Sequence, residues 1–183
     1  FSKIDYDFHF PSLKGEHQTE NASTAVATAI SINNKKINKK VFNKGLLSAS
    51  WAGRMQKLDK GNLSNILGSR FEIWLDGGHN IEASSMIKKE IQNWKKDKIF
   101  LVFGMMIGKD PIKFLKNIIN NVSSIFLLPI QDYQFIPPYE IKNKIISQLN
   151  KNIDVFCALE IKEALTIIKN KNQSGKILIC GSL

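Results

Sequence analysis

Residues 74–80 of the chain read WLDGGHN, and they complete a longer stretch whose apolar part, FEIWLD, spans residues 71–76. That run has the length and composition of a buried strand. It does not end on ordinary turn residues, because an acid, two glycines, a histidine and an asparagine follow one another. The glycines permit a close approach of the backbone to a ligand, and Asn80 is a suitable N-cap for a helix. The stretch therefore predicts a strand, a glycine turn and a helix, in that order.

The same alternation of strand and helix continues along the rest of the chain. Asp110 followed by Pro111 is a further helix start, since proline favours the first helical position. Helical segments are expected to begin near Asn80, Pro111, Pro138 and Glu160, and the apolar runs between them are FEIWLD, KIFLVFG, SIFLLPI, IDVFCA and KILICG. This pattern predicts an α/β fold, a Rossmann-like and mostly parallel sheet with helices on both faces.

Polar residues and glycines stand where these expected strands end. Ligands of parallel sheets bind beyond the carboxyl ends of the strands, and residues 76–80, 104–110 and 181–182 occupy such positions. A helix N-terminus there favours an anion, and Asp76 is suited to accept hydrogen bonds from ribose hydroxyls. The layout favours a phosphorylated ligand, with His79 projecting above the sheet. The plainer alternative is an Asp-Gly-Gly turn with a capping asparagine and a surface histidine.

Three other stretches are weaker signals taken alone. GMMIGKD, residues 104–110, resembles a phosphate-binding loop, but only three residues separate its glycines and Asp110 stands where a magnesium-binding Ser or Thr is needed. Lys109 is still suited to a carboxylate ligand, or it is simply exposed beside a capping acid. Arg54, one of two arginines in the chain, could bind a phosphate through both guanidinium nitrogens. Asn21 is either a helix cap or an amide that recognises a purine edge.

The first fifty residues follow a different pattern. From Asn21 onward small and apolar residues recur at helical spacing, and after the polar interruption NNKKINKK the stretch VFNKGLLSA predicts a short helix or turn. We place a domain boundary here, so that residues 1–47 and 48–183 belong to different domains. Beyond the boundary, GRMQKL is a candidate short strand and DKGNLSNILGS is expected to be a polar loop.

The charge of the chain raises the question of anionic partners. The formal net charge is +10, yet 24 of the 26 basic residues are lysines, spread along the chain among many Asn and Ile. Nucleic-acid modules typically cluster arginines and interleave aromatic residues, so we expect a solvated lysine surface and no nucleic-acid partner. Binding to nucleic acid through the lysines would instead show a steep salt dependence.

No stretch approaches the roughly 20 apolar residues that a membrane span needs, and no leader pattern opens the chain. We therefore expect a cytoplasmic protein without a membrane partner, and a monomer. Cys157 and Cys180 lie in apolar runs without a second ligand at metal spacing, which predicts reduced core residues and no metal site. The chain opens on Phe1 and not on methionine, so we expect a piece of a longer protein.

The motifs LKGEHQTENASTAVA, WAGRMQ, LDGGHN, VFGMMIGKD and ICGSL occur in this order over nearly the whole chain. As a set they resemble the consecutive blocks of folylpolyglutamate synthase and the bifunctional bacterial dihydrofolate synthase, which are members of the Mur ligase superfamily. The set is specific, because DGGHN follows an apolar strand shortly after W-x-G-R, although the loop between Arg54 and Asp76 is longer than is typical of the family. The sequence departs from the usual D-G-A-H-N of the family at Gly78.

The resemblance implies a role for each matching residue. Asn21 would contact adenine, Arg54 a phosphate and Asp76 the ribose of ATP. His79 would lie close to the reacting phosphate and to the incoming glutamate. By looser analogy, the residues that help to bind L-glutamate would be Lys109 and Ser182.

The resemblance also implies the reaction. Such enzymes use ATP to phosphorylate the carboxylate of dihydropteroate or of a folate polyglutamate, and the amine of glutamate then attacks the acyl phosphate. Residues 1–47 would be the end of the central ATPase domain, and residues 48–183 most of the glutamate-ligase domain. The phosphate loop, the Mg²⁺ ligands and most of the pterin site would precede Phe1, so we expect residues 1–183 alone not to turn over ATP.

Two other readings remain open at this point. One is a peptidoglycan-precursor ligase of the same superfamily, against which the histidines of DGGHN and of the HQ before Asn21 argue. The other is a non-catalytic Rossmann-like module that holds a nucleotide at its glycine-rich strand ends. A phosphate loop encoded upstream of Phe1 would favour the ligase, whereas a start codon just before Phe1 would favour the module.

Overall fold

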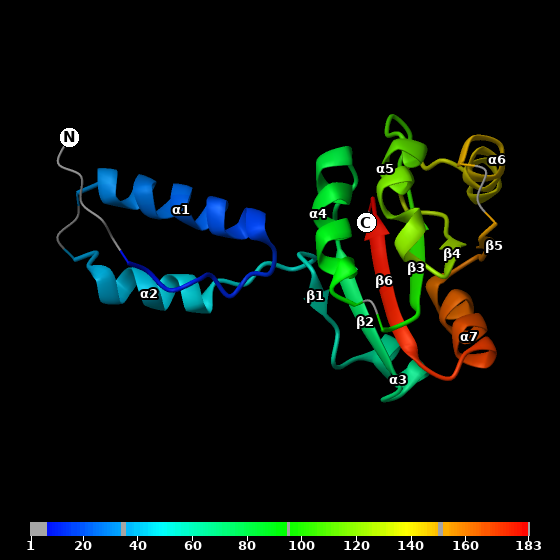
Figure 1. The fold of residues 1–183 in the computed structure, drawn as a ribbon, viewed down its shortest axis with the longest axis horizontal. Coiled ribbons are helices and arrows are strands. Elements are labelled where there is room, and N and C mark those ends of the chain that lie inside the picture. Colours follow the sequence, from blue (N-terminus) through cyan, green and yellow to red (C-terminus); the bar gives the residue numbers. More distant parts are fainter. Residues whose placement is uncertain (1–6, 34–35, 95, 150–151, 183) are drawn as a thin grey trace. The chain divides into compact units, whose positions relative to one another are not determined.

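A computed structural model describes residues 7–33, 36–94, 96–149 and 152–182 (Figure 1). The chain forms two compact units, Phe1–Ala52 and Gly53–Leu183. The division falls after Ala52, where the sequence pattern placed it after residue 47. The assignment of the two parts to an ATPase domain and a ligase domain is not tested by this division and stays a prediction.

The described residues of the first unit form two helices, α1 (Glu16–Ser31) and α2 (Lys39–Ser48). Because α1 begins at Glu16, Asn21 lies in its second turn, and the expectation that Asn21 heads the helix is wrong. The segment VFNKGLLSA is helical, since α2 covers most of it. Among the described residues of this unit, only Gln18 and Val26 are buried.

The second unit is built on a six-stranded sheet in the order β1-β2-β6-β3-β4-β5. All neighbouring strands are parallel except for the short edge strand β1, which is antiparallel to β2. The mostly parallel sheet is therefore confirmed, and β1 lies within the GRMQKL stretch. The strands are β1 (Gln56–Lys57), β2 (Phe71–Asp76), β3 (Ile99–Gly104), β4 (Ser124–Leu127), β5 (Asp154–Cys157) and β6 (Gly175–Gly181).

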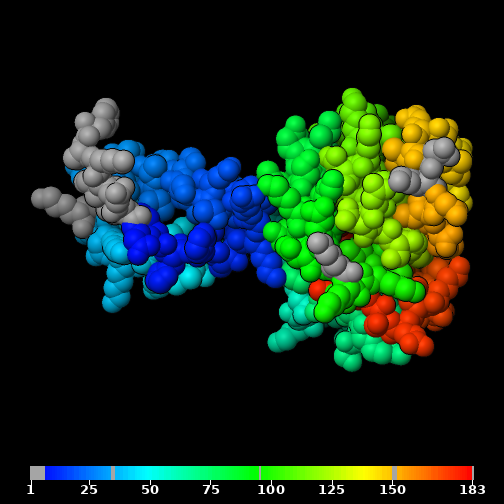
Figure 2. Space-filling model, in the orientation of Figure 1, coloured from blue at the N-terminus to red at the C-terminus, as the bar shows by residue number. Residues whose placement is uncertain are grey.

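Helices cover both faces of this sheet, as the sequence predicts. Successive residues of the central strands point to opposite faces, so that Leu101 packs with α4, α5 and α6 while Val102 packs with α3 and α7. Figure 2 shows that side chains fill the gaps that the ribbon drawing of Figure 1 leaves between these helices and strands. The helices are α3 (Asn62–Leu67), α4 (Ile81–Gln92), α5 (Pro111–Ile118), the 3-10 helix η1 (Ile119–Asn121), α6 (Pro138–Leu149) and α7 (Ile161–Lys171).

The helices begin close to the predicted starts, and two of these starts have side-chain caps. The side chain of Asn80 accepts a hydrogen bond from the Ala83 amide (2.8 Å), and that of Asp110 accepts two from the first turn of α5. The expected polar loop at residues 59–69 is wrong in part, because it contains α3, whose Leu67 is buried against the sheet. No described helix is of a length and apolarity that would carry it across a membrane.

The two cysteines are both free but differ in environment. Cys180 lies in the central strand β6 and is buried, as expected, and burial raises the pKa of its thiol well above the ordinary value. Cys157 is exposed, so its assignment to the core is wrong. The reason is the position of β5, an edge strand whose ends are open to solvent.

A charged cluster lies at the amino ends of β2 and β6. Glu72 pairs with Lys57 (3.0 Å) and with Lys176 (3.2 Å), and its carboxylate also accepts a hydrogen bond from the indole of Trp74 (3.2 Å). Lys176 also pairs with Asp97 (3.4 Å). The hydrogen bond from Lys57, followed by that from Lys176, lowers the pKa of Glu72 from 4.5 to about 2 against the opposing effect of burial.

We expect Glu72→Gln to lower the free energy of unfolding at pH 7 by about 1 kcal/mol, a modest value because the side chain is 37% exposed. A depressed pKa stabilises the folded state above pH 4.5, and this contribution disappears as the pH falls from 4.5 towards 2. The difference between Glu72→Gln and the parent protein should thus shrink over this range in urea unfolding. Asp59→Asn is the control, since Asp59 is 68% exposed and pairs with the same Lys57. A difference that stays constant from pH 7 to pH 2 would contradict the assignment.

Candidate active site

The carboxyl ends of three strands meet at one edge of the sheet. Asp76 of β2 lies opposite Cys180 of β6, and Gly104 of β3 lies opposite Gly181. The Gly181 amide donates to the Gly78 carbonyl (3.1 Å), and the Ser182 amide donates to the Gly104 carbonyl (3.0 Å). The end of β6 thus joins the loops that follow β2 and β3, and this confirms that the strand-end segments lie together. We call this edge the carboxyl edge.

Two glycines make this close approach possible. Gly181 has a φ of 112°, and a Cβ atom there would overlap the carbonyl oxygen of Gly104. A Cβ atom at Gly78 would lie 2.7 Å from the Ala83 Cβ and 2.8 Å from Asp76 Oδ1. Gly78, the position where the sequence departs from the family pattern, is therefore required by space in this loop.

Asp76 is buried, with 7% of its surface exposed, and it connects two loops. Its Oδ2 accepts a hydrogen bond from the Met55 amide (2.9 Å), and its Oδ1 accepts one from the Gly78 amide (2.8 Å). Met55 adopts a φ of 40°, an unusual conformation for a residue with a side chain. The carboxylate therefore holds the strained turn at Met55 against the DGGHN loop, and each oxygen can still accept a further hydrogen bond.

Arg54 lies beside the same loop. The Gly77 amide donates to the Gly53 carbonyl (2.8 Å), and the Arg54 guanidinium lies 3.4 Å from the place where a Gly77 Cβ would stand. The side chain is exposed, with one contact from Nη1 to the carbonyl of Gly53 (3.4 Å). Its remaining N–H groups are available for a planar anionic group.

His79 is exposed at the end of the loop, directly before the cap of α4. Its Nδ1 lies 3.0 Å from the Gly77 carbonyl. If Nδ1 carries the proton, as this contact requires, Nε2 is free to accept a proton or a hydrogen bond. The structure thus brings together three of the predicted site residues: Arg54, Asp76 and His79.

Ser182 and Lys109 belong to two segments that are joined by hydrogen bonds. The hydroxyl of Ser182 accepts a hydrogen bond from the Met106 amide (3.2 Å) and donates to the sulfur of Met105 (3.5 Å). Ser182 is buried, whereas Lys109 is exposed on the loop between β3 and α5. The hydroxyl therefore fixes the start of the loop that carries the lysine.

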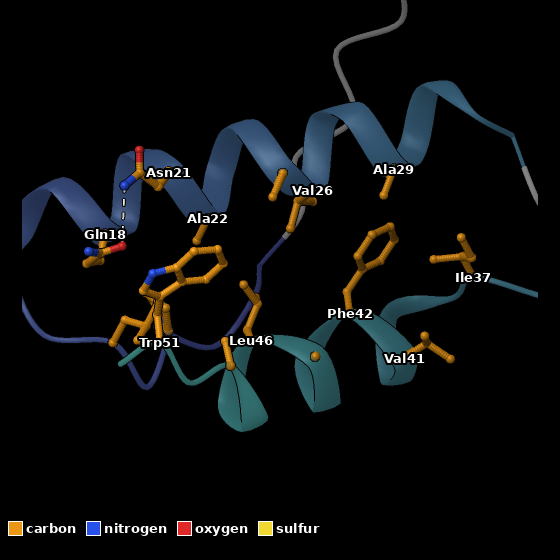
Figure 3. Close-up of a pocket in the computed structure, with 15 residues that line it drawn as sticks. Gln18, Asn21, Ala22, Val26, Ala29, Ile37, Val41, Phe42, Leu46 and Trp51 are labelled. Carbon is orange, nitrogen blue, oxygen red and sulfur yellow. Dashed lines mark hydrogen bonds between the residues drawn. The ribbon is translucent and has the colours of Figure 1, made fainter. Parts of the chain in front are cut away.

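Asn21 lies in the first unit. Its Nδ2 donates to the Gln18 side-chain oxygen (3.3 Å), and both residues line an open apolar cavity of about 560 Å³. Figure 3 shows Phe42, Leu46 and Trp51 pointing across this cavity toward α1. Asn21 is exposed, and its amide keeps a second N–H and an oxygen for other partners.

Several groups of the site carry no sequence signal. They include the amide of Met55, the carbonyl of Gly53 and the side chain of Gln56, which accepts a hydrogen bond from the Gly53 amide (2.9 Å). Backbone groups are present in every residue, so only the fold reveals which of them are used. Among the described residues there is no group of three or more His, Cys, Asp or Glu that could hold a metal ion.

Comparison with known proteins indicates the family to which the chain is related. The family model of the dihydrofolate synthetase C-terminal domain matches residues 59–183. Two archaeal proteins, each described as a probable bifunctional folylpolyglutamate synthase/dihydropteroate synthase, are similar. The protein of Halobacterium salinarum is 32% identical over 98 residues, which are 54% of this chain and 11% of that protein. The protein of Haloferax volcanii is 30% identical over 104 residues, or 57% and 11%.

Solved structures share the fold over almost the whole chain. Mycobacterium tuberculosis folylpolyglutamate synthase, crystallised with ADP and AMPPCP, gives a TM-score of 0.78 at 16% identity, over 94% of this chain and 39% of that one. A bifunctional folylpolyglutamate synthase/dihydrofolate synthase with Mn, AMPPNP and L-glutamate bound gives 0.75 at 18% identity, over 99% and 40%.

The chain thus spans about a tenth of the length of the curated relatives and about two fifths of these solved chains. The family model, in contrast, covers more than half of this chain, from residue 59 to residue 183. These solved structures share the fold of this chain, in which helices cover both faces of a mostly parallel sheet, as the sequence predicts. The chain belongs to the folylpolyglutamate and dihydrofolate synthase family, of which it contains the C-terminal portion.

Proposed function

We propose that the chain is part of an ATP-dependent ligase that joins L-glutamate to dihydropteroate, to a folate polyglutamate, or to both. One observation carries the proposal beyond the family. The hydrogen bonds from Met55 to Asp76 and from Gly77 to Gly53 gather a carboxylate, a guanidinium and an imidazole at the carboxyl edge. This is the edge at which parallel sheets bind their ligands.

The three groups suit the parts of a nucleotide. The free acceptor positions of Asp76 match the ribose hydroxyls, and the exposed guanidinium of Arg54 matches a phosphate, which it can bind with two parallel hydrogen bonds. Asn21, in the first unit, offers an amide that can both donate to and accept from adenine. These roles for Asn21, Arg54 and Asp76 are the ones that the sequence resemblance implies.

The proposed reaction has two displacement steps. A carboxylate oxygen of the pteroate or folate attacks the γ-phosphorus of ATP, and ADP leaves. The amine of glutamate then attacks the acyl carbon, phosphate leaves, and the amine loses a proton as the amide forms. Both steps develop negative charge on phosphoryl oxygens, so preorganised positive groups and hydrogen-bond donors stabilise their transition states. His79, with Nε2 open at this edge, is proposed to take the proton of the amine and, once protonated, to donate a hydrogen bond to these oxygens.

Lys109 is proposed to bind a carboxylate of the incoming glutamate. Its ammonium is exposed on the loop after β3, next in the sheet to the end of β6. Ser182 is proposed to contribute to the same site, since its hydroxyl fixes the start of that loop through Met106. We assign no Mg²⁺ ligand to the described residues, because none of their acidic or imidazole groups form a suitable cluster.

The first unit is proposed to be the end of the central ATPase domain. A unit of about fifty residues usually needs a well-buried core to fold alone, and here only Gln18 and Val26 are buried among the described residues. The open cavity between α1 and α2 is lined almost entirely by apolar groups. We therefore propose that further chain of the complete ligase covers this cavity.

The two arginines of the chain provide the test. In the complete ligase, Arg54→Ala is expected to weaken ATP binding by about 1 to 3 kcal/mol, or roughly 5- to 150-fold, because a charged hydrogen bond is lost. Arg70→Ala is the matched control, since Arg70 is also exposed but precedes β2 at the other edge of the sheet. Calorimetric titration with AMPPNP and formation of ADP in the presence of glutamate and dihydropteroate give the readouts. Equal ATP affinities in the two variants would refute the assignment of Arg54.

A further inference from the structure

The turn that carries Arg54 contains two residues in the left-handed region. Gly53 has a φ of 68° and Met55 has a φ of 40°, and Arg54 lies between them. Such a backbone is strained where a side chain is present, and it persists only when the surrounding structure holds it at several points. The place from which the Arg54 side chain starts therefore depends on the groups that hold its two neighbours.

Three successive peptide groups of this turn are each held by one hydrogen bond. The Met55 amide donates to the carboxylate of Asp76 (2.9 Å), and the Gly53 carbonyl accepts from the Gly77 amide (2.8 Å). The third bond runs from the Gly53 amide to the side-chain oxygen of Gln56 (2.9 Å). The DGGHN loop thus supplies two of the three bonds, and the WAGRMQ segment supplies the third by itself.

The backbone of Gln56 is in turn fixed by the sheet. Gln56 belongs to β1 and lies opposite Leu75 of β2, the residue directly before Asp76. Its side chain therefore ties the start of the turn to the same strand end that carries Asp76. Gly53 is buried, so its amide would lose its acceptor away from bulk water if Gln56 were replaced by an apolar residue. An unsatisfied amide of this kind favours a rearranged turn.

The geometry of the turn also affects the guanidinium of Arg54. Its Nη1 lies 3.4 Å from the Gly53 carbonyl oxygen, which accepts the Gly77 amide as well. The orientation of this carbonyl thus helps to decide where the guanidinium lies. An arginine side chain has many rotamers, and binding costs less entropy when the side chain is already held close to its bound position. A well-defined turn therefore presents Arg54 for an anion before the anion arrives.

We propose that Gln56 is a positioning residue: by holding the Gly53 amide, it sets the direction in which Arg54 points toward a phosphate of the nucleotide. Gln56 touches no ligand in this proposal and acts only through Arg54. The inference rests on the proposed function, which assigns the phosphate to Arg54, and it deepens that function by naming a residue on which the assignment depends. If Gln56 only stabilised the turn, its effect on nucleotide binding would not depend on the guanidinium of Arg54.

A double-mutant cycle in the complete ligase tests this dependence. Gln56→Met keeps the length of the side chain but removes the acceptor, and it is expected to weaken AMPPNP binding about fivefold because Arg54 is no longer preorganised. In the Arg54→Ala background, the same substitution should change the affinity less than about 1.5-fold, because no guanidinium remains to be positioned. Calorimetric titration gives the four dissociation constants. Gln92→Met is the control, since Gln92 is exposed at the end of α4, and it should leave the affinity unchanged in both backgrounds.

A second variant keeps the test decisive if Gln56→Met destabilises the turn. Gln56→Asn retains the amide but is one methylene shorter, so it should show the same dependence on Arg54. An unchanged affinity of both Gln56 variants, or an equal loss with and without Arg54, overturns this inference alone. If Arg54→Ala binds AMPPNP as tightly as the parent ligase, the assignment of the phosphate to Arg54 falls together with the inference. If the parent ligase forms no ADP with glutamate and either dihydropteroate or folate, the proposed function itself falls.

Discussion

Gly181→Ala is expected to lower the free energy of unfolding of the second unit by at least about 3 kcal/mol. Two effects combine at this position. The φ of 112° is unfavourable for any residue with a side chain, and the new Cβ would overlap the Gly104 carbonyl oxygen in the neighbouring strand. Relief of this overlap requires β6 to move away from β3, which breaks the hydrogen bond from the Ser182 amide to the Gly104 carbonyl.

Gly61 offers a closely matched control. Its φ of 109° is nearly the same, but no atom lies within 4 Å of a Cβ placed there. Gly61→Ala should therefore report the backbone strain alone, about 1 kcal/mol, and the difference between the two variants measures the overlap. Chemical denaturation of the chain, followed by tryptophan fluorescence, gives both values. Equal losses in the two variants would show that β6 and β3 are not held as closely as described.

Asp76→Ala is expected to destabilise the second unit by about 3 kcal/mol, even without nucleotide. The substitution leaves the amides of Met55 and Gly78 without their acceptor in a buried place, and each orphaned amide costs about 1 to 3 kcal/mol. The strained conformation of Met55 also loses the bond that holds it. Asp76→Asn keeps one carbonyl oxygen and should lose less stability.

Asp110→Ala distinguishes the loss of a buried hydrogen-bond acceptor, as at Asp76, from the loss of an exposed helix cap. Asp110 also accepts two backbone hydrogen bonds, from Ile112 and Lys113, but its side chain is 48% exposed, so water can replace it. Its removal should cost about 1 kcal/mol, as for other helix N-caps. Urea unfolding of Asp76→Ala, Asp76→Asn and Asp110→Ala ranks the three. If Asp76→Ala were no less stable than Asp110→Ala, the carboxylate would not hold the two loops, and a role restricted to the ribose would be the better account.

The sequence predicts the frame of the second unit well, for physical reasons. Short apolar runs such as FEIWLD and KILICG are long enough only for strands, and Asn80 and Asp110 are caps that the structure uses. The position of the candidate site can be predicted from these strands, because the carboxyl ends of parallel strands lie at one edge of the sheet. The grouping of Arg54 with Asp76 follows from their motifs, while the roles of these residues in binding remain proposals.

Other features depend on packing and could not be read from the chain. Nothing in the stretch DKGNLSNILGS distinguishes a polar loop from the short helix α3, which is held by burial of Leu67. The run IDVFCA looks like a core strand, yet β5 is at the edge and Cys157 is exposed. The insertion of β6 between β2 and β3 also has no local signal, because it is a relation between distant segments.

That insertion has a consequence for synthesis on the ribosome. β6 is the last of the six strands to be synthesised. It nevertheless lies in the middle of the sheet, where it pairs with both β2 and β3 (Figure 1). A nascent polypeptide that lacks Gly175–Gly181 lacks the strand that pairs with both β2 and β3, so no backbone hydrogen bonds join the two parts of the sheet. Long-range pairing of this kind delays folding. The second unit therefore cannot complete its sheet until β6 has been synthesised. Its half-made form is the state in which aggregation or capture by a chaperone would compete with assembly.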